Sequence, residues 1–141
     1  MSEPSYDDVR SRLSAEQSAR LDVTVSPQVT HVYLPRAGFG QALLSLVKNA
    51  LDATNDGPSP VVVEFTQEAG RLSVLVRDQG RGIPPEVLHR AGEPFFTTKE
   101  AGRGLGLGLF LARIFAERIG GSLTLQSSQG TTARLDLPIR T

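Results

Sequence analysis

Three polar residues in "SLVKNALDA", residues 45–53, have the spacing of one helical flank. Ser45, Asn49 and Asp52 are separated by four and three positions, so a helix would align them beside its apolar stripe. Asparagine and aspartate are mediocre helix formers, so a helix gains little from them by propensity alone. The pattern indicates either a functional flank or an ordinary solvated face.

A second candidate is Asp78, which opens "DQGRGIP" (78–84) after an alternating apolar run. Leu72, Val74 and Val76 share one face of the predicted strand, and the period of two places Asp78 on that same core-directed face. A carboxylate there needs a hydrogen-bond donor, because burying it unpaired would cost several kcal/mol. The amino group of a ligand could be that donor. Alternatively, Asp78 simply begins a turn, since Asp and Gly are the usual turn residues.

Glycine occupies every second position from 102 to 108 in "EPFFTTKEAGRGLGLGLFLARIF", residues 93–115. Because glycine weakens strands, a loop that leads into a helix fits this alternation better than a strand does. Backbone N–H groups at such a helix N-terminus could bind an anion, with Lys99 and Arg103 nearby, although a plain turn before a packed helix has the same spacing. The stretch is neither a P-loop, which needs Gly-Lys-Ser/Thr, nor a Rossmann fingerprint, which follows the first strand of a βαβ unit.

The composition restricts the class of protein. The 141 residues suit one domain with a single core, and 15 basic residues balance 15 acidic ones. This balance argues against non-specific binding to nucleic acid or to anionic membranes. The absence of cysteine excludes disulfides and thiolate chemistry, and neither a signal peptide nor a membrane span is apparent. We therefore expect a cytoplasmic domain.

The hydrophobic periodicity predicts alternating helical and extended segments. We interpret residues 1–20 as a linker remnant before a domain of residues 21–141. Residues 6 to about 20 are polar with a thin apolar stripe that includes Leu13, which predicts a short helix within this linker. Strands and helices in this order predict an α/β sandwich with helices on one face of a mixed sheet. The predicted elements after the linker are a hairpin (21–25 and 28–34), a helix (40–54), a hairpin (61–66 and 71–78), a helix (107 to about 119, stopped by Gly120 and Gly121) and a final hairpin (122–138).

Together, the motifs are more specific than any of them alone. The set "LLSLVKNALDA", "DQGRGIP", "PFFTTK" and "GRGLGLGL" resembles, in order and spacing, the nucleotide-binding boxes of the ATP-binding catalytic domain of sensor histidine kinases. The resemblance covers roughly residues 21–139 and implies the Bergerat fold of the GHKL superfamily, a mostly antiparallel sheet with about three helices on one face. The run "GLGLGLFLARIFAERIGG" is also similar to redox-responsive sensor kinases.

The resemblance implies a role for each motif. Asn49 would give Mg²⁺ an amide oxygen, with Lys48 and Asp52 near the nucleotide, and Asp78 would accept the adenine amino group of ATP. Residues 95–99 would form a short lid, and the glycine stretch would face the phosphates. The other residues that the resemblance assigns to the nucleotide are Ser45, Gly80, Gly82, Ile83, Phe96, Thr97, Thr98, Lys99, Arg103, Gly104, Leu105, Gly106, Leu107 and Thr131.

Two departures refine the predicted function. Ser45 stands where superfamily ATPases carry a water-activating glutamate, which favours phosphoryl transfer over hydrolysis. The phosphoacceptor histidine of the family sits in a dimerising helical hairpin, and neither His31 nor His89 has that context. We therefore expect a monomeric phosphoryl donor, with no catalytic residue of its own, that serves a separate histidine-bearing dimerisation domain and, downstream, a response regulator.

Two other functions remain open on the sequence. An anti-sigma-factor serine kinase of the same superfamily has nearly this length, although it would normally keep the glutamate at the position of Ser45. A non-catalytic nucleotide-binding module would act as an interaction partner, but its motifs would be expected to degenerate. We expect a cytoplasmic location, either free or as the cytoplasmic part of a membrane-bound sensor kinase.

Overall fold

The computed structural model describes residues 12–27, 29, 35–54, 60–80, 105–128 and 130–139, with only the backbone at 36, 105–108 and 128. Several predicted features lie outside the described residues. They are the strand at 28–34 (apart from Val29), both histidines, and residues 81–104, which include Gly82, Ile83, the lid, Arg103 and Gly104. The elements are α2 (Ala15–Ala19), β1 (Leu21–Val25), α3 (Arg36–Ala53), β2 (Val61–Glu68), β3 (Arg71–Asp78), α5 (Leu105–Arg118), β4 (Ser122–Ser128) and β5 (Gly130–Pro138).

The strands form one five-stranded sheet in the order β1-β2-β3-β5-β4. β1 pairs with β2 in parallel, and the other three pairs are antiparallel, so the predicted mixed and mostly antiparallel sheet is confirmed. The parallel pair requires a crossover, and α3 lies in the connection between β1 and β2. The register of β3 with β5 places Asp78 opposite Thr131.

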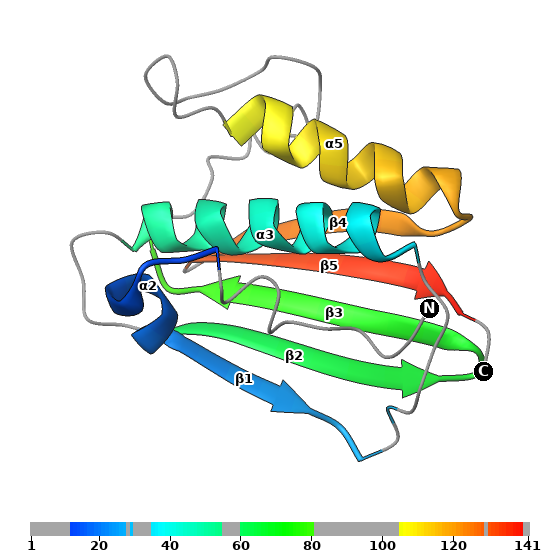
Figure 1. The fold of residues 1–141 in the computed structure, drawn as a ribbon, viewed down its shortest axis with the longest axis horizontal. Helices are drawn as coiled ribbons and strands as arrows, with labels where there is room; N and C mark the ends of the chain where they lie inside the picture. Colours follow the sequence, from blue (N-terminus) through cyan, green and yellow to red (C-terminus); the bar gives the residue numbers. More distant parts are fainter. Residues whose placement is uncertain are drawn as a thin grey trace.

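Helices α3 and α5 cover one face of the sheet and run side by side in opposite directions (Figure 1). Alternate residues of β2, β3 and β5 point toward them and are fully buried, among them Phe65, Val74 and Leu135. The helices approach closely at Gly38, where a Cβ would lie 2.7 Å from the ring of Phe115. No helix in the described ranges has the length and apolar character of a membrane span.

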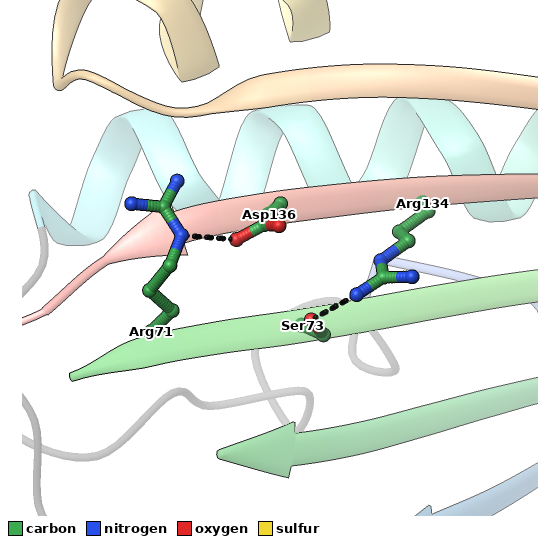
Figure 2. Close-up of polar contacts among 4 residues, drawn as sticks. All are labelled: Arg71, Ser73, Arg134 and Asp136. Carbon is green, nitrogen blue, oxygen red and sulfur yellow. Dashed lines mark hydrogen bonds and ion pairs between the residues drawn. The ribbon is translucent and has the colours of Figure 1, made fainter. Parts of the chain in front are cut away.

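The other face of the sheet is polar and pairs its own charges. Arg71 of β3 donates to Asp136 of β5 at 2.7 Å, and Arg134 of β5 donates to the hydroxyl of Ser73 at 3.3 Å (Figure 2). Arg77 likewise contacts Glu64 at 2.6 Å on the neighbouring strands. Antiparallel sheets commonly leave one such face to solvent.

Local signals set most element boundaries, with a few shifts from the prediction. α3 begins at Arg36, four residues before the predicted start, because Pro35 occupies the N-cap in extended geometry and its carbonyl accepts the Phe39 N–H at 2.9 Å. α5 begins at Leu105, two residues earlier than predicted, and ends at Arg118, just before the predicted stop at Gly120. There the Gly121 N–H donates to Ala116 and the Gly120 N–H to Glu117, which is the Schellman arrangement with Gly120 at φ 89°.

Only residues 12–20 of the segment before the sheet are described. Among the described residues its helix covers only Ala15–Ala19, closed by a capping box between Ser14 and Gln17. Leu13, which we placed on the apolar stripe of a longer helix, precedes α2 and packs partly against the core.

Candidate functional site

Asp78 ends β3 with its side chain on the core face, as the alternation predicted. It is 7% exposed, and it and Thr54 are the buried polar residues of the described chain. The N–H of Gly80 donates to Asp78 Oδ1 at 2.9 Å, and the N–H of Thr131 donates to the same oxygen at 3.3 Å. Backbone donors from two segments of the chain therefore fix the orientation of this carboxylate.

Two glycines bring other backbone segments against the Asp78 turn. A Cβ at Gly80 would lie 2.6 Å from the carbonyl carbon of Ala53, at the end of α3. A Cβ at Gly130 would lie 3.0 Å from the carbonyl carbon of Asp78, and Gly130 also adopts φ 98°. Backbone packing requires both positions to be small, and no signal in the sequence indicated this requirement at Gly130.

Helix α3 presents the predicted polar flank. Ser45, Asn49 and Asp52 are half-buried at its border, whereas Lys48 is exposed. The Nδ2 atom of Asn49 is buried and has no hydrogen-bond partner among the described residues. Most buried polar atoms in proteins are hydrogen-bonded, so this amide is well suited to interact with a bound group.

These residues gather at one end of the molecule. The C-terminus of α3, the end of β3, the beginning of β5 and the N-terminus of α5 all lie at the left side of Figure 1. Hydrogen bonds join Asp78, Gly80 and Thr131, and the Gly80–Ala53 contact joins this group to α3. Leu105, Gly106 and Leu107 form the first turn of α5, so their backbone N–H groups belong to a helix N-terminus.

The arrangement suits a ligand with a hydrogen-bonding base and an anionic group. A buried carboxylate held in a fixed orientation can accept a further hydrogen bond from a ligand donor such as an aromatic amino group. A helix N-terminus at the same end favours an anion such as a phosphate. The described residues thus combine the two recognition elements that an adenine nucleotide requires.

Comparisons with known proteins agree with this geometry. Residues 36–141 match the family described as histidine kinase-, DNA gyrase B- and HSP90-like ATPases. The histidine protein kinase DivJ of Caulobacter vibrioides is 37% identical over 118 residues, which cover 80% of the chain and 20% of the kinase. The chain therefore spans only a small part of this longer relative.

Solved structures of histidine kinases have the same fold. A mycobacterial sensor histidine kinase, MprB, superposes with a TM-score of 0.79 and 27% identity over 95% of this chain and 91% of that one. The catalytic domain of the histidine kinase ThkA gives a TM-score of 0.79 and 26% identity over 94% of this chain and 88% of that one. These likenesses confirm the predicted Bergerat fold, and the chain belongs to the histidine kinase-, DNA gyrase B- and HSP90-like ATPase family as a histidine kinase catalytic domain.

Proposed function

We propose that the chain binds Mg·ATP at the end of the sheet marked by Asp78 and donates its γ-phosphoryl group to a histidine on a separate dimerisation domain. The observation that carries the proposal is the buried Asp78 carboxylate, oriented by the Gly80 and Thr131 N–H groups. In this role the Asp78 carboxylate accepts a hydrogen bond from the adenine amino group. Gly80, Gly82, Ile83 and Thr131 complete the adenine end.

Helix α3 would hold the metal in this proposal. Mg²⁺ usually keeps several waters and takes one or two protein ligands together with phosphate oxygens. The Asn49 amide fits that need, because its buried Nδ2 lacks a partner among the described residues and the amide can be turned to present its oxygen. Asn49 is then the protein ligand to Mg²⁺, and Ser45, Lys48 and Asp52 are its neighbours on the helix.

The phosphates would lie at the N-terminus of α5. The N–H groups of Leu105, Gly106 and Leu107 are in its first turn, where the helix dipole stabilises negative charge. The segment before α5 would close over the phosphates. Its residues in this role are Gly104, Arg103, Lys99 and the lid residues Phe96, Thr97 and Thr98. Bound Mg²⁺ would supply positive charge to offset the negative charge of the phosphates during transfer.

The partners and the location belong to the same proposal. The names of the relatives describe histidine kinases and two-component sensors, which supports a histidine-bearing domain as acceptor and a response regulator downstream. The isolated chain is then a monomer in the cytoplasm. The similarity to redox-responsive kinases stays a prediction.

Calorimetry with ADP and Mg²⁺ tests the proposal, with Asp78→Asn as the diagnostic variant. The isosteric amide keeps an oxygen for the Gly80 and Thr131 N–H groups but turns its NH₂ toward the adenine amino group, which sets donor against donor. We expect a loss of affinity of about tenfold or more, equivalent to about 1.4 kcal/mol. Parent-like ADP binding by Asp78→Asn would refute the adenine assignment, and no saturable binding by the parent would refute the proposed function.

A further inference from the structure

Arg20 connects the segment before the sheet to the C-terminal end of α3. It lies between α2 and β1, and its Nη2 donates to the carbonyl oxygen of Thr54 at 2.7 Å and also to the Thr54 hydroxyl. Its own carbonyl accepts the Val61 N–H at 2.9 Å, so its backbone is fixed at the first pair of the β1–β2 ladder. Arg20 is thus anchored on both its backbone and its side chain.

The position of Thr54 at the end of α3 explains why a positive charge is favourable there. It is 4% exposed and is the C-cap of α3, and its hydroxyl lies within hydrogen-bond distance of the Ala50 and Leu51 carbonyls at 3.1 and 3.3 Å. The last carbonyls of a helix lack intrahelical partners, and cations near them are favoured by the helix dipole. Since α3 has no basic residue in its last turn, Arg20 supplies this positive charge from another part of the chain.

The same helix end contacts the Asp78 turn. Ala53, the residue before Thr54, is the one whose backbone excludes a Cβ at Gly80, and the Gly80 N–H donates to Asp78. A continuous series of contacts therefore runs from Arg20 through Thr54, Ala53 and Gly80 to Asp78. Asn49 and Asp52 lie on the last turns of the same helix.

We propose that Arg20 is a positioning residue for nucleotide binding, which acts by fixing the C-terminal turn of α3 against the Asp78 turn. This inference rests on the proposed nucleotide site. Without Arg20 the Thr54 carbonyl loses its charged donor, the last turn of α3 frays, and Ala53 no longer holds Gly80 in place. The adenine carboxylate and the metal-binding flank then lose their fixed separation.

The test combines calorimetry of ADP·Mg²⁺ with amide resonances of the nucleotide-free chain. Arg20→Ala removes the donor and Thr54→Val removes the hydroxyl, and each should raise the Kd about three- to tenfold. Thr54→Ser, which keeps the hydroxyl, should bind within about twofold of the parent. At a temperature where every variant is fully folded, a loss of stability alone would leave the Kd unchanged.

The matched control is Arg71→Ala. It removes a guanidinium whose 2.7 Å hydrogen bond to Asp136 is as short as that of Arg20 to the Thr54 carbonyl, but which lies on the polar face of the sheet away from the helices. It should leave the Kd unchanged. In the absence of nucleotide, Arg20→Ala should shift the amide resonances of Gly80 and Thr131, the two donors to Asp78, and Arg71→Ala should not.

The outcomes separate this inference from the proposed function. Suppose that the parent binds ADP·Mg²⁺ and that Arg20→Ala and Thr54→Val have the same Kd and the same Gly80 and Thr131 resonances as the parent. The positioning role alone would then be overturned. Absence of binding by the parent would overturn the nucleotide site and the inference with it. Should Arg20→Ala fail to fold, the pair Thr54→Val and Thr54→Ser decides the same question.

Discussion

Gly80 shows how a single residue type serves the site by being small. Its missing side chain lets the Asp78 turn touch the backbone of Ala53, and Gly130 lets the beginning of β5 touch the backbone of Asp78 and Gln79. Backbone atoms cannot move aside as a flexible side chain can, so any Cβ at these two positions must displace an element. The orientation of the buried carboxylate depends on both glycines.

Gly80→Ala is expected to destabilise the fold by about 1–3 kcal/mol, because overpacking of this size forces a backbone shift. The control is Gly40→Ala in α3, where a Cβ would meet nothing within 4 Å. That change should stabilise the protein by about 0.5–1 kcal/mol, because alanine is the better helix former. Urea denaturation of both variants measures the difference, and a Gly80→Ala protein as stable as the parent would contradict the close packing.

Ser45 provides a second prediction at this scale. A serine hydroxyl is a poor base for activating water, so ATP turnover by the chain alone should be very slow. Ser45→Glu should raise turnover, because the half-buried position on the polar flank of α3 then carries a carboxylate. Phosphate release under saturating Mg·ATP measures both rates. Rapid turnover by the unmodified chain would point to a different base.

At the scale of elements, the β2–β3 hairpin has a tighter turn than the sequence suggested. We predicted "QEAG" (67–70) as the connection, but β2 continues to Glu68, which pairs with Arg71. Only Ala69 and Gly70 remain in the turn, at φ 52° and 76°. Two positive φ values define a type I′ turn, whose right-handed twist matches that of the strands. Alanine at the first position therefore carries strain.

Ala69→Asn is expected to stabilise the protein by about 0.5–1 kcal/mol, because asparagine tolerates the left-handed region and Asn-Gly is the preferred type I′ pair. For a chain of this size the melting temperature should rise by roughly 3 °C. Gly70→Ala, in contrast, should lower it, since a side chain is added at positive φ. A scanning calorimeter can compare the two variants, and a lower melting temperature for Ala69→Asn would rule out strain at this position.

At the scale of the whole molecule, the proposed reaction needs a second protein domain. With radiolabelled ATP and a histidine-bearing hairpin from the cognate kinase added in trans, we expect acid-labile label on the hairpin. Asn49→Ala should abolish the labelling, because it removes the proposed metal ligand. The chain alone should remain unlabelled, and stable label on its own His31 or His89 would contradict the assignment as a donor domain.

The sequence by itself determined the local structure and the chemistry of the individual motifs. The period of two placed Asp78 on the buried face of its strand, and spacings of three and four placed Asn49 on the border of α3; both placements are confirmed. Gly120 marked the end of α5. Such features depend on neighbouring residues alone, because side-chain direction follows from the repeat of the backbone.

Only the tertiary structure decided which distant segments meet. The register that sets Thr131 opposite Asp78 joins residues 53 positions apart, and the Arg20–Thr54 contact joins residues 34 positions apart. A glycine in a sequence does not reveal which segment packs against it, and only the structure showed that Gly80 packs against the backbone of Ala53. Long-range pairs are fixed by the packing of complete elements, and no local pattern of residues encodes them.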